Sequence, residues 1–180
     1  MKQSNYEEVL NVFFDNPNGK FYIREIARIT KLNPNTILNI TNRLEKEGFI
    51  SKEKKKHVVE IYAVLDEKFK MLKIIHNLKQ IYQSRLIEFL NNYYNNPKSI
   101  ILFGSFRQGE DIIRSDIDIA IENEDFKKHQ VIELNELSEF EKKFNRKIQL
   151  HLFNKTNVDL NVFNNIANGI VLSGFLEVKK

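Results

Sequence analysis

Two aspartates and a glycine–serine pair are the residues of this sequence best suited to chemistry. They lie in "FGSFRQGEDIIRSDIDIAI", residues 103–121, where ten residues separate Gly104-Ser105 from Asp116 and Asp118. The two aspartates alternate with isoleucines, a pattern that predicts a strand carrying both carboxylates on one face. Such close carboxylates repel each other unless a cation lies between them, and Mg²⁺ completed by substrate phosphates suits the pair. The pattern therefore predicts a metal site formed by Asp116 and Asp118.

The glycine–serine pair is placed to bind phosphate. It follows "SIILF", residues 99–103, an apolar run typical of a strand buried on both faces, and "FRQGED" after it predicts a short helix. Glycine allows the sharp turn, and the N–H groups at the start of a helix bind anions. Ser105 adds a hydroxyl, so the segment predicts a nucleoside triphosphate site at Gly104 and Ser105.

The spacing Gly-Ser, ten residues, Asp-x-Asp closely resembles the minimal nucleotidyltransferases of the DNA polymerase beta superfamily, over about residues 80–175. The resemblance implies transfer of a nucleotide with release of pyrophosphate. It implies that Asp116 and Asp118 are catalytic ligands of Mg²⁺ or Mn²⁺, and that Gly104 and Ser105 hold the triphosphate. Arg107 is a further candidate phosphate contact. Because many minimal members are antitoxins that AMPylate a HEPN-domain toxin, a separate HEPN-type toxin is the acceptor that the resemblance suggests.

The third carboxylate of that family has no counterpart here. The next predicted strand is "KIQLHLF", residues 147–153, after a predicted amphipathic helix over 129–145, and it places Gln149 where the acid is expected. An amide brings no negative charge and is a poor proton acceptor, so losing a general base here costs about 10²–10⁴-fold in rate. His151, on the same face, is either a packing histidine or a substitute base or metal ligand. Two functions stay open: a nucleotidyltransferase, or a catalytically inactive regulator that uses the fold as a sensor or partner-binding module.

The N-terminal third predicts three helices, over 6–14, 21–30 and 34–47, followed by a two-stranded ribbon over 49–65. This is the order of a winged helix-turn-helix. The pattern "IREIA…LNPNTI…L…L…EGFI" resembles the archaeal and bacterial winged-helix regulators. The resemblance implies binding of double-stranded DNA, with the third helix in the major groove and the wing beside the phosphates.

The candidate DNA contacts fall into two groups. Base contacts are expected from amides, a hydroxyl and a guanidinium on the third helix, and phosphate contacts from the basic tip of the ribbon. The first group is Asn35, Thr36, Asn39 and Arg43; the second is Lys52, Lys54, Lys55 and Lys56. The alternative is a solvated face on a protein–protein docking module.

We therefore expect an α+β chain in three parts: a winged helix-turn-helix over 1–66, a long connecting helix over 67–97, and a small mixed α/β nucleotidyltransferase domain over 98–180. A predicted helix over 157–170 and the ending "NGIVLSG" complete that domain as a helix followed by a turn. The connecting helix is apolar more than halfway round, so a homodimer seam along it is one alternative.

Charge and composition indicate the cellular compartment in which the chain works. The net charge is +4, and residues 98–180 carry 12 basic and 13 acidic side chains, so the basic excess lies before them. Cysteine is absent, which fits a reducing compartment. The first residues carry acids within their apolar run and no small-residue cleavage site, and no apolar run reaches the length of a membrane span. We expect a cytoplasmic protein with no membrane partner.

Overall fold

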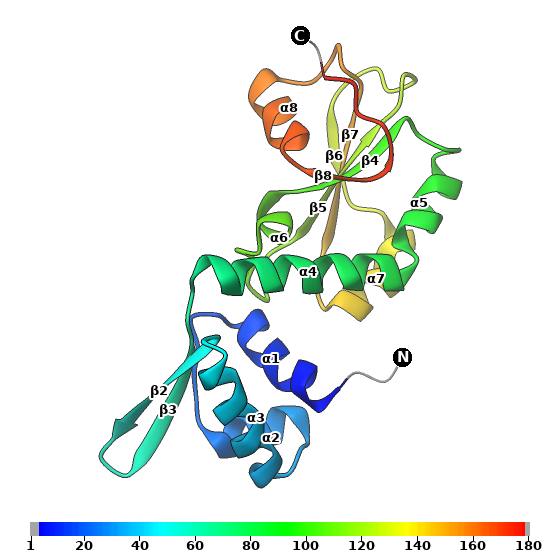
Figure 1. Cartoon of the computed structure of the whole chain (residues 1–180). Helices are drawn as coiled ribbons and strands as arrows, with labels where there is room; N and C mark the ends of the chain where they lie inside the picture. Colours follow the sequence, from blue (N-terminus) through cyan, green and yellow to red (C-terminus); the bar gives the residue numbers. More distant parts are fainter. Residues whose placement is uncertain (1–3, 179–180) are drawn as a thin grey trace. The chain divides into compact units, whose positions relative to one another are not determined.

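The computed structural model describes residues 4–178, which form two compact units divided between Lys73 and Ile74. The first unit contains three helices and a small antiparallel sheet of order β1-β3-β2 (Figure 1). Its elements are α1 (Asn5–Asp15), β1 (Lys20–Phe21), α2 (Ile23–Thr30), α3 (Pro34–Lys46), β2 (Ile50–Lys55) and β3 (Val58–Ala63). The predicted winged-helix order is confirmed, and β1 adds a third strand that the sequence did not indicate.

Local signals explain where α3 begins and ends. The Asn33 side chain accepts a hydrogen bond from the N–H of Asn35 at 2.9 Å, and Pro34 occupies the first helical turn, where its missing N–H costs nothing. Gly48 follows the helix with φ +81°, a conformation that glycine adopts without strain. The inner face of α3 buries Ile37 and Leu44 in the core of the unit. Its outer face is exposed to solvent.

The second unit is built on a five-stranded mixed sheet of order β6-β7-β5-β4-β8. Its strands are β4 (Ser99–Phe103), β5 (Ile117–Glu122), β6 (Gln130–Ile132), β7 (Ile148–Phe153) and β8 (Ile170–Gly174). Its helices are α5 (Leu86–Tyr93), α6 (Gly104–Gln108), α7 (Ser138–Phe144) and α8 (Leu160–Ala167), with a 3₁₀ turn at Asn135–Leu137. Helix α4 (Glu67–Ser84) crosses from the first unit into the second.

The two faces of this sheet have different roles. On one face the isoleucines of β5 pack with Leu150 of β7 and with residues of α5 and α7 in the main core. On the other face a smaller apolar cluster, including Ala120 and Ile166, lies under α8 (Figure 1). Because side chains alternate along a strand, Asp116 and Asp118 belong to this second face. The candidate metal ligands therefore lie on the face of the sheet that α8 covers.

Two predicted elements near the ends of the second unit differ from the structure. The connecting helix is not continuous, because Arg85 adopts φ +67° and the Ser84 hydroxyl accepts the Leu86 N–H at 3.1 Å, which separates α4 from α5. The ending "NGIVLSG" is not a helix and turn, because α8 ends at Ala167 and β8 pairs antiparallel with β4.

The predicted helix over 129–145 is also wrong in its first half. Its first residues form the edge strand β6, in which Val131 pairs with His151 of β7, and the helix starts only at Ser138. The β-branched pair Val131 and Ile132 favours pairing with the free edge of β7 over helix. Within residues 4–178, none of the helices has the length and apolar character needed to cross a bilayer.

Candidate functional site

The glycine–serine turn lies against the second aspartate. Strands β4 and β5 pair antiparallel with Phe103 opposite Asp118, so Gly104, the next residue, emerges beside that carboxylate. Gly104 has φ +71°, and a Cβ built on it would overlap Asp118 Oδ2 and lie 3.1 Å from Asp118 Cγ. A side chain at residue 104 would therefore strain the backbone and push the Asp118 carboxylate aside. Glycine brings the backbone of the turn directly onto the aspartate.

Gln149 lies beside the aspartate pair. Strand β7 runs parallel to β5 with Gln149 paired to Asp118, as the alternation of β7 predicted. The Gln149 amide donates a hydrogen bond from Nε2 to Asp116 Oδ2 at 2.8 Å. Where a third carboxylate was expected, the site therefore has a hydrogen-bond donor that contacts Asp116.

The carboxylates fit a metal ion only if a substrate completes the coordination. Among residues 4–178, no group of three or more His, Asp or Glu side chains is arranged to hold a metal ion. Asp116 and Asp118 are both partly exposed, so their hard oxygen ligands remain accessible. Mg²⁺ is commonly bound in this way, by one or two carboxylates together with substrate phosphates and water.

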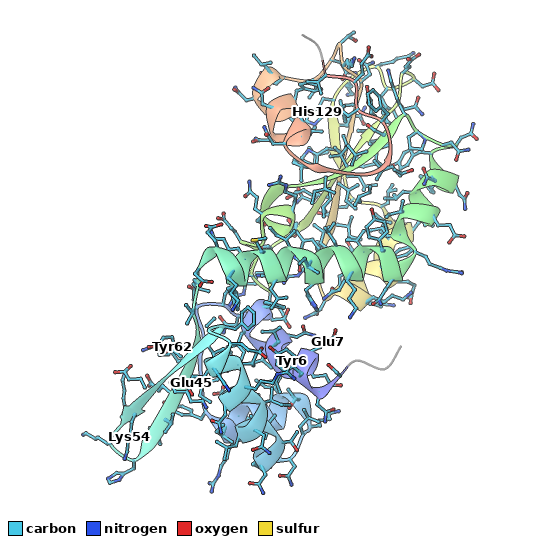
Figure 2. All side chains as sticks on the ribbon, viewed as in Figure 1. Tyr6, Glu7, Glu45, Lys54, Tyr62 and His129 are labelled. Atoms are coloured by element: carbon cyan, nitrogen blue, oxygen red, sulfur yellow. The ribbon has the colours of Figure 1, made fainter. Side chains whose placement is uncertain are left out.

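Two histidines border the same face. His151 Nε2 lies 3.7 Å from Asp118 Oδ1, and only 15% of the His151 side chain is exposed. Its ring meets Phe103 edge-on, with centroids 4.8 Å apart, and stacks on His129 at 5.7 Å. Burial, together with the neighbouring His151, lowers the pKa of His129. Sequence analysis missed His129 (Figure 2), because a helix over 129–145 would not have paired this segment with β7.

A buried ion pair fixes the loop between the turn and the aspartates. Asp111 is fully buried, and its Oδ2 lies 2.9 Å from Arg146 Nη2, while Asn77 Nδ2 donates to its Oδ1 at 2.9 Å. Arg146 also donates to the carbonyl oxygens of Ile112 and Ser115. The start of β7 is thus tied to the segment that enters β5. Residues 111 and 146 are far apart in sequence, and no local motif pointed to them.

Arg107 and two further charged residues of this unit, Arg114 and Asp159, lie in different environments. Arg107, a predicted phosphate contact on α6, is partly buried, and its Nε has no hydrogen-bond partner in the part of the chain that the structure describes. Arg114 is exposed. Asp159 caps α8 by accepting the N–H of Asn161 at 2.9 Å, so its carboxylate serves the helix start.

The exposed face of α3 contains the predicted base contacts. Asn35 and Asn39 are exposed and Thr36 is partly buried. Arg43 is exposed too, but its Nε lies 2.8 Å from Glu47 Oε1 and its guanidinium lies 4.6 Å from the centroid of the Tyr6 ring. Arg43 is therefore held along its own helix.

The wing lysines divide into paired and unpaired residues. Lys52 lies 3.1 Å from Glu45, and Lys55 lies 2.9 Å from Glu60. Lys54 and Lys56 form no ion pair with any residue that the structure describes, and Figure 2 labels Lys54 near the tip of the β2–β3 hairpin. The free positive charge of the wing is thus smaller than its lysine count suggests.

Comparison with known proteins gives a family match and distant likenesses among solved structures. The family model described as "Polymerase beta, Nucleotidyltransferase" matches residues 83–174, just over half of the chain. No curated protein sequence matches. Among solved structures, a MarR family protein from Bacillus stearothermophilus is 18% identical with a TM-score of 0.35, over 51% of this chain and 59% of that one. This chain therefore spans less than two thirds of that protein, and the winged-helix description rests on the order of its own elements.

Proposed function

This chain belongs to the polymerase beta nucleotidyltransferase family, and we propose that its second unit binds a nucleoside triphosphate together with a divalent metal ion. The observation that carries the proposal is the close approach of the turn to Asp118, where a Cβ added at Gly104 would overlap the Asp118 carboxylate. Phosphate oxygens held at the turn would lie close enough to the aspartates to share an ion with them. A side chain at residue 104 would fill that space.

The residues of the site have separable roles in this proposal. Asp116 and Asp118 would hold Mg²⁺ or Mn²⁺, which when bound neutralises charge on the triphosphate. The Ser105 hydroxyl would donate a hydrogen bond to the phosphates. Arg107, on the same helix, would bring a positive charge close to them. Gln149 holds Asp116 through its amide, so the carboxylate keeps one orientation.

Nucleotide binding without efficient transfer is a second candidate function, and the Gln149–Asp116 hydrogen bond favours it. In transfer, the attacking hydroxyl must lose a proton, and a carboxylate accepts that proton far better than an amide does. Gln149 stabilises an existing charge but takes up no proton. If transfer occurs, the HEPN-type toxin remains the predicted acceptor.

We further propose that the first unit binds double-stranded DNA through α3 and the wing. Support comes from the exposed amides of Asn35 and Asn39, which match adenine edges, and from the unpaired Lys54 and Lys56, which suit phosphates. Thr36, Arg43, Lys52 and Lys55 complete the proposed surface. Arg43, Lys52 and Lys55 each form an ion pair with a glutamate, which would have to be broken or shared before the residue contacts DNA.

The proposed function is tested by incubating the purified chain with labelled ATP, then the other triphosphates, with Mg²⁺ or Mn²⁺. Nucleotide binding and pyrophosphate release are both followed, beside a variant with Asp116→Asn and Asp118→Asn. A variant with Glu124→Gln and Asp125→Asn, exposed acids outside the site, removes the same charge as a control. Metal-dependent release lost only in the first variant establishes an enzyme, and binding without release establishes a sensor. Absence of both in the wild-type chain contradicts the proposal.

A further inference from the structure

Three imidazole nitrogens of the stacked pair His129 and His151 are buried without a hydrogen-bond partner in the described residues: Nδ1 and Nε2 of His151 and Nε2 of His129. A neutral imidazole has one donor and one acceptor nitrogen, and buried polar atoms in folded proteins nearly always find partners. Both nitrogens of His151 depart from this rule. Such atoms call for a water molecule, an ion or a ligand.

The distance between His151 and Asp118 fits a shared ion better than a direct bond. Nε2 and Oδ1 lie 3.7 Å apart, too far for a hydrogen bond. Two ligand atoms bound at about 2.0–2.1 Å to one tetrahedral ion are separated by about 3.4 Å. A small movement of either side chain would bring both atoms into coordination.

The surroundings hold His151 in this orientation. Its backbone is fixed by the parallel pairing of β7 with β5, where it lies opposite Ala120. Its ring is confined between the edge contact with Phe103 and the stacked ring of His129. A ligand whose orientation is set by packing loses little freedom when it binds an ion.

We propose that His151 Nε2 and Asp118 Oδ1 bind one divalent ion that prefers nitrogen ligands, a first-row transition ion such as Co²⁺ or Zn²⁺, over Mg²⁺. Imidazole favours such ions, whereas Mg²⁺ favours oxygen ligands alone. Phosphate oxygens and water complete the coordination, because the described residues supply no third protein ligand. The inference rests on the proposed function for the role of Asp118 as a metal ligand, and His129 acts as a positioning residue.

The test is titration of the purified full chain with Co²⁺ and with Mg²⁺, each with and without a non-hydrolysable ATP analogue. The visible absorption of Co²⁺ reports its coordination directly. We expect His151→Asn to weaken Co²⁺ binding by about 10–100-fold, and Mg²⁺ binding by less than about twofold. His76→Gln, a histidine substitution on α4, should leave both affinities at the wild-type value.

Two results would overturn the inference: equal Co²⁺ affinity in wild type and His151→Asn, or an equal loss for Co²⁺ and Mg²⁺, which would make His151 a packing residue only. A measurement on the wild-type chain removes dependence on the variant's folding. Co²⁺ should shift the imidazole signals of His151 and His129 in NMR spectra and leave those of His57 in place. Failure of the ATP analogue to bind with any metal contradicts the proposed function alone, since Co²⁺ titration without nucleotide still decides the role of His151.

Discussion

The two candidate sites differ in how their functional side chains are held. Around Asp118, neighbouring strands fix the backbone register, and the aspartates are approached from two segments, by Gly104 at the β4–α6 turn and by Gln149 and His151 of β7. On the proposed DNA surface, side chains are exposed and several are satisfied by acids of the same unit, as in the Lys55–Glu60 pair. A site for chemistry is specified by packing and register, whereas a surface for a charged polymer needs charges that can exchange partners.

The largest effect is expected where the candidate site around Asp118 depends on a buried charge. Arg146→Met removes the partner that lies 2.9 Å from the fully buried Asp111 carboxylate. Breaking a buried ion pair typically costs about 3–5 kcal/mol of folding free energy. Urea unfolding should show a loss of this size, and the nucleotide site should loosen with the loop.

The matched control for Arg146→Met is Lys142→Met, which breaks the exposed pair with Glu139 on α7 at 2.8 Å. Exposed pairs contribute little to stability because solvent screens them, so this variant should unfold almost like the wild type. Similar losses in both variants would show that Arg146 and Asp111 do not hold the loop.

The next effect concerns the glycine turn. Gly104→Ala combines φ +71° with overlap of the new Cβ and Asp118 Oδ2, so it should displace the carboxylate. A displacement of about 1 Å at a reacting site costs on the order of 10²-fold in rate. We expect nucleotide affinity to fall as well, because the displaced carboxylate no longer shares an ion with phosphates at the turn. Calorimetric titration with ATP and Mg²⁺ measures it.

Gly48→Ala is the control that separates backbone strain from the contact of the new Cβ with Asp118. Gly48 has φ +81° with nothing within 4 Å of the added Cβ, so this variant carries backbone strain alone, about 1–2 kcal/mol. It should lower stability and leave nucleotide affinity unchanged. Undiminished nucleotide affinity in Gly104→Ala would instead place the triphosphate away from the turn.

A smaller effect tests Gln149, the amide that stands where the third carboxylate was expected. Gln149→Asp replaces the donor to Asp116 with a carboxylate that accepts a proton. Mg²⁺-dependent pyrophosphate release should rise at least about tenfold, a part of the roughly 10²–10⁴-fold that a well-placed general base contributes. Gln149→Glu gives the same charge with a longer reach and should raise release less. Retained nucleotide binding with no rise in release would show that Gln149 does not limit transfer.

The smallest effects are expected on the wing. A Lys54→Ala and Lys56→Ala variant should weaken DNA binding for all sequences alike and reduce the slope of log affinity against log salt by about 2. Lys52→Ala and Lys55→Ala together should reduce the slope less, because both lysines already pair with acids. Fluorescence anisotropy over a salt series distinguishes the two pairs, and equal slopes would contradict the division into paired and unpaired lysines.

Short-range patterns made much of this fold predictable. Alternation along residues 116–121 and 147–153 located β5 and β7 and the shared face of Asp118, Gln149 and His151. Capping signals at Asn33 and Pro34 located α3. Each of these features depends on residues within one or two turns or strands.

What sequence analysis missed depends on partners distant in the chain. The strand β6 is short, and it forms because β7 offers a free edge, so His129 reached the site unforeseen. The Asp111–Arg146 pair joins segments that only the folded sheet brings together. The helix break at Arg85 requires a left-handed conformation that its side chain gave no reason to expect.

The most direct test of the proposed function is calorimetric titration of the full chain with ATP in Mg²⁺ and in EDTA, beside Asp118→Asn. Our proposal predicts saturable binding in Mg²⁺ that is lost in EDTA and in the variant. Binding that is equal in all three samples, or absent from the wild type with every divalent ion tried, would contradict a metal–triphosphate site at the Gly104 turn.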